Sequence, residues 1–331
     1  MFAVTYRDNN QVRVFDSSTY RLLRTYQNPE AQLDWPHGLT VTDKHIIVSN
    51  KHNSPNKPSI FNIYRIDDPS GEPAKVFTTP IEHLRVAHSH ALKSQRLLVT
   101  YAGGAFPALA SYRFDDETGE ISGPIDSQES WFKTSGKPKG VCFNDDGTKA
   151  FVTFITEKRV KYRFFNKYQK ARNLLRKKNG ARNLIRVLLS EPRKLFTGFK
   201  TRGGSTDRLA NGIAIFDVDE NGMLSKEPVQ TILKSDYCRL ENINIAEGLC
   251  AVADAVNGKV ELYELDGDAF PEKPTQVIQE NLFFPHDACL SPDRKILVIA
   301  NDGIEVKDTQ IRWYSFVQPR GDNVKIYELQ K

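Results

Sequence analysis

Three of the seven histidines of this chain stand in short segments that resemble one another. His37 lies in PHGLTV, His90 in SHALKS and His286 in PHDACL. Lys139 in PKGVCF and Asn242 in ENINIA hold the matching place in two further segments. Neutral imidazoles can bind a divalent metal or take a proton from water. We therefore predict that these five residues form a ring, with His37, His90, His286 and Lys139 as the catalytic candidates.

The ring is compatible with several kinds of chemistry. Two or three imidazoles with an open water position would suit a divalent metal. Alternatively, one imidazole acts as general base on water while Lys139 stabilises an oxyanion. The histidines could also do no more than hydrogen-bond neighbouring backbone groups. No organic cofactor is expected, and a divalent metal at the histidine ring stays open.

Further polar residues stand at the ends of strand-like runs that should lie close to the ring. They include Arg7 after FAVTY, His52 after IIVSN, Asp254 in CAVADA and Asp302 in VIAND. We expect the substrate to be bound by these four residues together with Glu241 and Asn242.

The elements that must position these residues repeat along the chain, and internal repeats of this length indicate stacked or radial architectures. Segments beginning at Pro36, Ser89, Pro138, Glu241 and Pro285 each contain an apolar strand, a polar turn and a second apolar strand. A third strand with alternating aromatic residues follows each of them: SIFNIYRID, ALASYRFDD, GIAIFDVDE, KVELYELDG and IRWYSFV. The N-terminal residues form a sixth copy, FAVTY, QVRVFD and RLLRTYQ, which lacks a first strand.

Four antiparallel strands in each repeat of about 40 to 55 residues are typical of a β-propeller. The sequence therefore predicts an all-β fold, a single domain over residues 1–331 with about six four-stranded blades; seven blades are the alternative. In such a fold the first strand of every blade lines a central channel. The ring and the polar loop residues should then meet at one mouth of that channel.

The ends of two third strands, YRFDDETGEISGP and FDVDENGMLSKEP, together with PHDACLSPDRKILVIAND, carry a family resemblance. They resemble the repeats of lactonase-type propellers, which include bacterial 6-phosphogluconolactonase and the carboxymuconate-lactonizing enzymes. The resemblance implies hydrolysis or isomerisation of a lactone-like ester, with histidine, arginine and glutamate in the channel. His286 matches that pattern best and His37 next. Arg239 and Glu241 stand near the predicted mouth, although the repeats leave their register open.

Residues 157–208 interrupt this pattern within the fourth blade. Residues 158–202 hold 16 Lys or Arg and one acidic residue, a formal charge of +15. Because the whole chain carries +5, the remainder carries −10. Apolar residues recur at spacings of three and four, with Lys and Arg between them, which predicts a basic helical insertion on the channel-mouth face.

Three roles for the insertion remain open. It could cap the channel and attract an anionic substrate, lie on an anionic membrane surface, or bind an acidic protein. The residues expected to contact a membrane or partner share this amphipathic segment: Phe164, Phe165, Lys170, Arg172, Arg176, Lys177, Arg182 and Arg186. Nucleic acid is the least favoured partner, because the rest of the chain is acidic and carries no base-reading motif.

Function and location follow from these observations. We expect a lactonase-like enzyme, a hydrolase or isomerase, that acts on a small polar or anionic metabolite. The alternative is a non-catalytic propeller that docks on a membrane or acidic partner through its insertion. No run of about 18 apolar residues occurs, and the N-terminus alternates like a strand. A cytoplasmic protein is expected, either free or peripheral at the membrane.

Overall fold

The computed structural model describes most of the chain outside the basic insertion. The described residues are 1–51, 57–81, 83–103, 106–155, 211–234, 238–255, 257–267, 269–280, 282, 284–301, 306–307, 313–314 and 323–329. The predicted insertion 157–208, with its eight candidate contact residues, lies outside them, as do His52 and Asp302.

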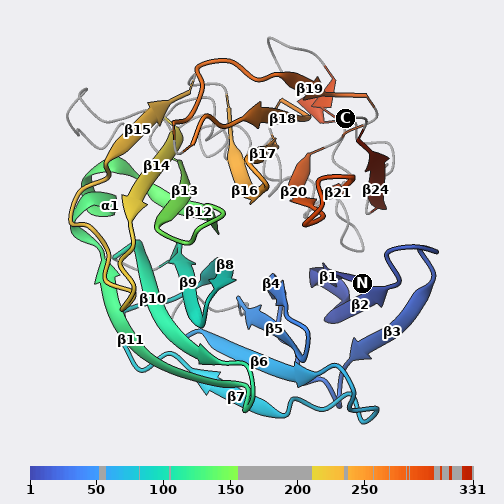
Figure 1. Cartoon of the computed structure of the whole chain (residues 1–331). Coiled ribbons are helices and arrows are strands. Elements are labelled where there is room, and N and C mark those ends of the chain that lie inside the picture. Colours follow the sequence, from blue (N-terminus) through green and yellow to red (C-terminus); the bar gives the residue numbers. More distant parts are fainter. Residues whose placement is uncertain are drawn as a thin grey trace, which may run out of the picture.

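The described residues form six antiparallel sheets around a central axis, which is the arrangement of a six-bladed β-propeller (Figure 1). Four of these sheets have four strands, and the first and last have three. The fold is thus all-β, with one short helix, α1 (Ser130–Ser135), and one 3-10 turn, η1 (Arg7–Asn9), among the described residues.

The strands follow one another from the axis outward in blades one to three. Blade one contains β1 (Phe2–Tyr6), β2 (Gln11–Phe15) and β3 (Leu22–Gln27). Blade two contains β4 (Pro36–Val41), β5 (His45–Asn50), β6 (Ile60–Arg65) and β7 (Lys75–Thr78). Blade three contains β8 (Ala87–Lys93), β9 (Arg96–Tyr101), β10 (Ala108–Asp115) and β11 (Glu120–Gln128).

The second half of the chain repeats this order. Blade four contains β12 (Lys137–Phe143), β13 (Lys149–Ile155), β14 (Gly212–Asp217) and β15 (Gln230–Leu233). Blade five contains β16 (Leu240–Ala246), β17 (Leu249–Asp254), β18 (Lys259–Glu264) and β19 (Gln276–Ile278). Blade six contains β20 (Pro285–Leu290), β21 (Ile296–Asn301) and β24 (Asn323–Glu328), and a separate pair is formed by β22 (Val306–Lys307) and β23 (Trp313–Tyr314).

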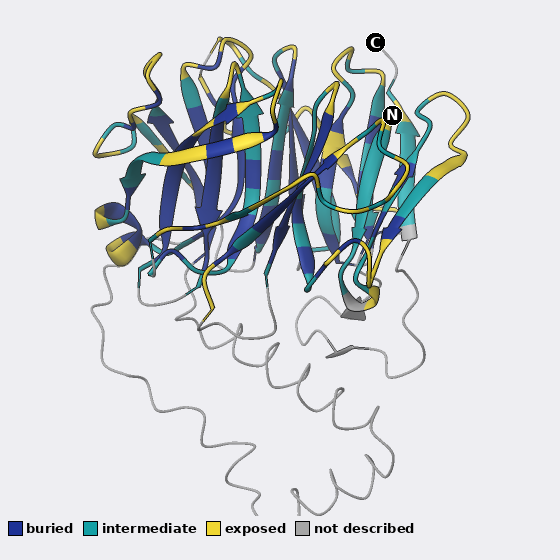
Figure 2. Cartoon of the chain, turned by 90° about the horizontal axis from the view of Figure 1, so that it is seen from below, coloured by how far each residue is buried: buried dark blue, intermediate teal, exposed yellow. Residues whose placement is uncertain are grey.

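Apolar side chains between neighbouring blades form the core. The second and third strands carry most of them because both of their faces are covered, so that β5 and β17 are buried along their whole length. Five clusters of buried residues each join two adjacent blades, from the first blade to the sixth. Figure 2 shows this buried interior and the more exposed outer strands. Burying each large apolar side chain stabilises the fold by roughly 1.5–3 kcal/mol.

The repeat pattern predicted most strands correctly. The N-terminal copy was expected to lack its first strand, but β1 is that inner strand, and a fourth, outer strand is what the described residues of blade one do not include. The predicted third strands of blades two to five are β6, β10, β14 and β18. The prediction for the last blade was wrong. IRWYSFV was expected to be its third strand, but β24 pairs with β21 instead, while Trp313 and Tyr314 belong to β23. Both segments alternate apolar and polar residues, so the pattern alone could not choose between them.

The segment between β13 and β14 leaves the fourth blade at the end of the channel where the predicted ring residues lie. β13 ends at Ile155, which pairs with Lys137 at the start of β12, and β14 begins at Gly212 opposite Phe154. Among the described residues, no helix has the length and apolar character needed to cross a membrane. All four cysteines carry free thiols, and three of them are buried.

Candidate functional site

Each inner strand of blades two to six carries a β-bulge after its first one or two residues. In β4, for example, Pro36 pairs with Asn50 and Leu39 with Val48, so one extra residue is inserted; the other inner strands shift at the equivalent place. A bulge re-aims the side chain that it carries. The bulged residues are His37, His88, Lys139, Glu241 and His286. The repeat therefore places five polar side chains at one level of the channel.

Hydroxyl groups of the second strands support three of these bulges. A bulge leaves the next backbone N–H without its ladder partner. Ser49 Oγ accepts the N–H of Gly38 at 3.0 Å, Thr100 Oγ1 that of Ser89 at 3.1 Å, and Thr153 Oγ1 that of Gly140 at 2.8 Å. The inner strands are thus held in their bulged conformation by buried hydrogen bonds, which favours a rigid site.

Three imidazoles meet at this level. The ring centroids of His37 and His88 lie 4.2 Å apart, those of His37 and His286 5.1 Å apart, and those of His88 and His286 5.9 Å apart. The Nδ1 atom of His37 lies 2.6 Å from the backbone carbonyl of His88. Since a carbonyl only accepts hydrogen bonds, Nδ1 of His37 carries the proton and Nε2 keeps a lone pair.

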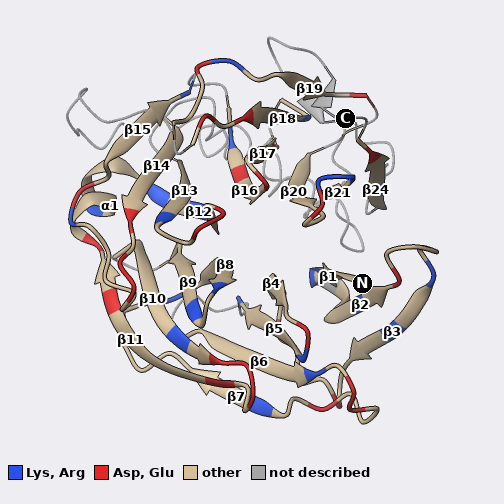
Figure 3. Ribbon diagram, viewed as in Figure 1, with Lys and Arg blue, Asp and Glu red and all other residues tan. Residues whose placement is uncertain are grey.

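The carboxylate of Glu241 is completely buried beside these imidazoles. Its Oε2 lies 3.4 Å from His88 Nε2, 3.8 Å from His286 Nε2 and 3.8 Å from Lys139 Nζ. Its Oε1 forms an ion pair with Arg239. In Figure 3 the inner strand β16 carries a red, acidic segment and β12 carries blue, basic segments. Glu241 is the acidic residue of β16, and Lys139 is one of the two lysines of β12. A buried carboxylate is tolerated only with such partners.

The histidines of the cluster are neutral near pH 7. Burial is the main cause that lowers the pKa of His37, His88 and His286 well below the ordinary value of 6.5. Positive neighbours lower each pKa further: Lys51 for His37, Lys139 for His88 and Arg239 for His286. Neutral imidazoles can accept a proton or a metal ion, so either chemistry is open to this cluster.

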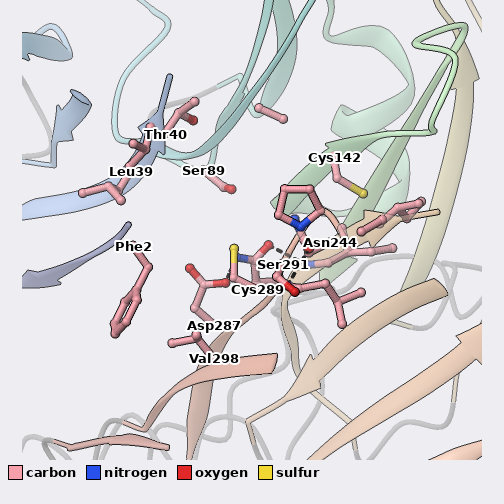
Figure 4. A pocket seen from close by; sticks show the side chains of 18 of the residues that line it. Phe2, Leu39, Thr40, Ser89, Cys142, Asn244, Asp287, Cys289, Ser291 and Val298 are labelled. Atoms are coloured by element: carbon pink, nitrogen blue, oxygen red, sulfur yellow. Dashed lines mark hydrogen bonds between the residues drawn. The ribbon is translucent and has the colours of Figure 1, made fainter. Parts of the chain in front are cut away.

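The cluster opens into a cavity of about 1160 Å³ along the channel. Figure 4 shows side chains from all six inner strands in its wall, among them Phe2 of β1, Thr40 of β4 and Asp287 of β20. The lining extends from His37 and Glu241, at the starts of their strands, to Asp145 and Asp293 in the turns at the opposite ends. A small metabolite has ample room here, since ligand pockets commonly measure about 300–1,000 Å³.

The structure separates His90 from the other predicted ring residues. His90 lies two positions beyond the bulge, and its ring packs against blade two, where Nδ1 is 2.7 Å from Thr40 Oγ1 and Gly38 leaves space for it. Burial lowers its pKa to about 4. The sequence AHSHALK holds two histidines two positions apart, and the alignment of the repeats selected the second one. His88 takes the place that was predicted for His90.

Asn242 is likewise displaced from the ring by one residue. Its Nδ2 donates to Asp287 Oδ1 of the neighbouring blade, and its Oδ1 accepts the N–H of Ile243. Burial raises the pKa of Asp287 to about 6. Glu241, the bulged residue that precedes Asn242, occupies the ring position that was predicted for Asn242.

The remaining predicted residues lie around the cluster in different ways. Lys139 belongs to it, with Nζ 3.3 Å from His88 Nε2. Arg7 stacks on the ring of Trp35, which lies in the loop before β4. Asp254 accepts the backbone N–H of Arg239 at 3.0 Å, so it positions the arginine and does not line the cavity.

His88 and Arg239 are the two site residues that the sequence interpretation did not assign. A signal for His88 was present, because the hydroxyl residues Ser49, Thr100 and Thr153 hold matching places in the second strands. Aligning the repeats on these hydroxyls would have put His88 opposite His37. For Arg239 the sequence offers no comparable signal, because it precedes its inner strand and its contact with Glu241 depends on the loop.

Comparison with known proteins identifies the fold. No family model matches the sequence, and no curated protein matches it. The structure is similar to that of a protein described as a candidate 6-phosphogluconolactonase from Bacteroides uniformis, with a TM-score of 0.55 and 11% identity over 97% of this chain and 88% of that one. A second such protein, from Bacteroides fragilis, has a TM-score of 0.52 and 13% identity over 96% of this chain and 80% of that one.

A functionally unknown protein from Desulfotomaculum acetoxidans is similar too, with a TM-score of 0.51 and 10% identity over 96% of this chain and 78% of that one. Identities this low speak for the fold alone. At the level of the fold, the chain resembles the lactonase-type β-propellers.

Proposed function

We propose that this protein hydrolyses a lactone-like ester of a small anionic metabolite at the histidine end of the channel. The observation that carries the proposal is the buried carboxylate of Glu241 in contact with His88, His286, Lys139 and Arg239. This combination supplies a base, an orienting carboxylate and cations in one place. Histidine, arginine and glutamate are also the residue types that the family resemblance implies.

The neutral imidazole of His286 is the best placed general base. Its side chain is 25% exposed, so water can reach it, and its Nε2 lies 3.8 Å from Glu241 Oε2. A water molecule gives its proton to this imidazole while its oxygen bonds to the lactone carbonyl carbon. Glu241 stabilises the imidazolium that forms, as a buried carboxylate does in a hydrolase triad.

The two cations of the site, Lys139 and Arg239, can stabilise negative charge that develops during the reaction. Lys139 or Arg239 stabilises the oxyanion of the tetrahedral intermediate inside the buried site. When the intermediate collapses, the ring C–O bond breaks and the imidazolium returns its proton to the leaving alkoxide. The product is a hydroxy acid. Arg7 and Lys51, which contribute to the lowered pKa of His37, add positive charge that favours an anionic substrate.

The first substrate to test is 6-phosphogluconolactone, because two structural neighbours are described by that activity. Acid release in a pH-stat measures hydrolysis, with the spontaneous rate subtracted. We expect acceleration by the protein and loss of that acceleration in His286→Ala. If lactones with a phosphate or carboxylate group all hydrolyse at the spontaneous rate, the proposed function is wrong.

A further inference from the structure

We propose that His37, His88 and His286 bind one divalent transition metal ion such as Zn²⁺. Each imidazole can offer one ring nitrogen, and these three nitrogens lie within 4.8 Å of one another. Four-coordinate zinc with its usual bond lengths to nitrogen needs roughly 3.4 Å between ligand atoms. Small side-chain rotations can supply that contraction. The three ligands would leave one position open. With the ion bound, the lone pair of His286 would be occupied, so a hydroxide at the open position would be the nucleophile in place of water activated by His286.

Among the described residues, two of these imidazoles have a ring nitrogen with no hydrogen-bond partner. These atoms are Nε2 of His37 and Nδ1 of His88, and both are shielded from solvent. A buried polar atom without a partner costs free energy that a ligand can recover. Since Nδ1 of His37 donates to a backbone carbonyl, its unpartnered Nε2 bears the lone pair that a metal requires.

The surroundings of the imidazoles resemble those of metal-binding histidines. Such residues commonly donate their second ring N–H to a backbone carbonyl or a carboxylate, which orients the ring. His37 does this with the carbonyl of His88. The Nε2 atom of His88 lies between Lys139 Nζ at 3.3 Å and Glu241 Oε2 at 3.4 Å, so a metal on Nδ1 would require the Nε2–H to turn to Glu241. Both contacts come from the bulged positions of rigid inner strands, so the backbone that carries the ligands is fixed and only the side chains need to rotate.

The local charge determines what the fourth ligand should be. Lys139 and Arg239 contact Glu241, so this carboxylate is already shared with two cations. A dication in this setting needs further negative charge. We infer that the open position takes an anion, either hydroxide or a carboxylate, which the nearby cations help to hold.

The test uses protein from which any histidine tag has been removed and which has been treated with a chelator. Titration with Zn²⁺ in a calorimeter gives stoichiometry and affinity, and Co²⁺ gives the visible absorption of a tetrahedral site. We expect one ion per chain. His88→Ala should weaken Zn²⁺ binding by more than about 100-fold, since loss of even an outer contact can cost that much. His83→Ala is the control, because this histidine is 43% exposed and contacts Glu129 instead.

His286→Ala provides a second variant, because its partly exposed side chain contributes least to packing. It should weaken binding as His88→Ala does, with a melting temperature close to that of the wild type. Absence of a stoichiometric site, or equal affinity in wild type and both variants, would overturn the proposal. The binding assay needs no turnover, so a metal-binding protein without lactonase activity would contradict only the proposed function.

Discussion

The Oε2 atom of Glu241 in blade five lies 3.4 Å from the Nε2 atom of His88 in blade three. The two residues are far apart in sequence, and both occupy the bulged position of an inner strand. Blade four contributes Lys139 between them, 3.8 Å from the same oxygen. A propeller can therefore build a buried charged site from one position of its repeat, since equivalent residues of successive blades converge on the axis.

The contact predicts that Glu241→Gln impairs the enzyme strongly. The amide keeps the shape of the side chain but cannot stabilise an imidazolium, so kcat/KM should fall by at least about 100-fold. The measurement is lactone hydrolysis under saturating and limiting substrate. Glu247→Gln is the matched control, because Glu247 lines the far end of the same cavity. Equal losses in both variants would argue against a role for the histidine end.

His286, inside the cluster, and His90, outside it, should separate function from stability. His286→Ala is expected to remove activity and leave the melting temperature nearly unchanged, because its side chain is 25% exposed. His90→Ala should keep activity but lower the free energy of unfolding by roughly 1–3 kcal/mol, since it removes the buried imidazole contact of Thr40 Oγ1 and leaves only the contact with the backbone carbonyl of residue 90. Thermal unfolding and hydrolysis assays on both variants check this. Loss of activity in His90→Ala, with activity kept in His286→Ala, would show that His90 belongs to the active site and His286 does not.

The buried histidines predict that stability falls in acid. The unfolded chain takes up protons as pH drops below about 6.5, whereas His90 in the folded chain resists protonation until about pH 4. The free energy of unfolding should therefore decrease between these values, by at most about 1.4 kcal/mol per pH unit for each such histidine. Denaturant unfolding from pH 7 to pH 4 measures the slope. His90→Gln should make it shallower, and an unchanged slope would assign the effect to other groups.

Between about pH 4 and pH 6, Asp287 should change the free energy of unfolding in the direction opposite to that of the histidines. Its pKa of about 6 lies above that of the unfolded chain, so the folded state binds more protons between roughly pH 4 and pH 6. Stability from this group is present at low pH and is lost as the pH rises through 6. Asp287→Asn, which keeps a partner for Asn242, should make the wild-type acid loss steeper over the same range. A shallower curve would contradict the raised pKa.

Close packing of neighbouring inner strands predicts that Gly140→Ala is destabilising. A Cβ atom at this position would stand 2.5 Å from Cα of Asn242 and 2.7 Å from the backbone nitrogen of Ile243. Because backbone atoms cannot give way easily, β12 and β16 must move apart, at a cost of about 1–3 kcal/mol. Ser89→Ala at the matching repeat position already has a Cβ and serves as the control. Chemical denaturation of both variants measures the difference.

The membrane hypothesis for the insertion can be tested by charge reversal. Changing Lys170, Arg172, Arg176 and Lys177 to Glu should abolish binding to anionic vesicles, because each basic residue near such a surface contributes on the order of 1 kcal/mol. Co-sedimentation with phosphatidylserine vesicles is the measurement, and neutral phosphatidylcholine vesicles are the control. Unchanged sedimentation would eliminate a membrane role for these residues.

The sequence by itself determined the propeller. Alternating apolar residues with period two, interrupted by polar turns, specify strands wherever they occur, and their repetition specified the order of strands within each blade. It also placed His37, Lys139 and His286 at equivalent positions, because each follows a proline that begins an apolar run. These features are local, so they can be recognised without knowing which blades meet.

Only the tertiary structure decided which polar residues share the site. Residues two apart lie on one face of a strand, so the sequence alone could not choose between His88 and His90. A bulge adds one residue, which places Glu241 and not Asn242 among the imidazoles. The contacts of Glu241 with His88, Lys139 and His286 join three other blades, and they arise because the chain closes around an axis.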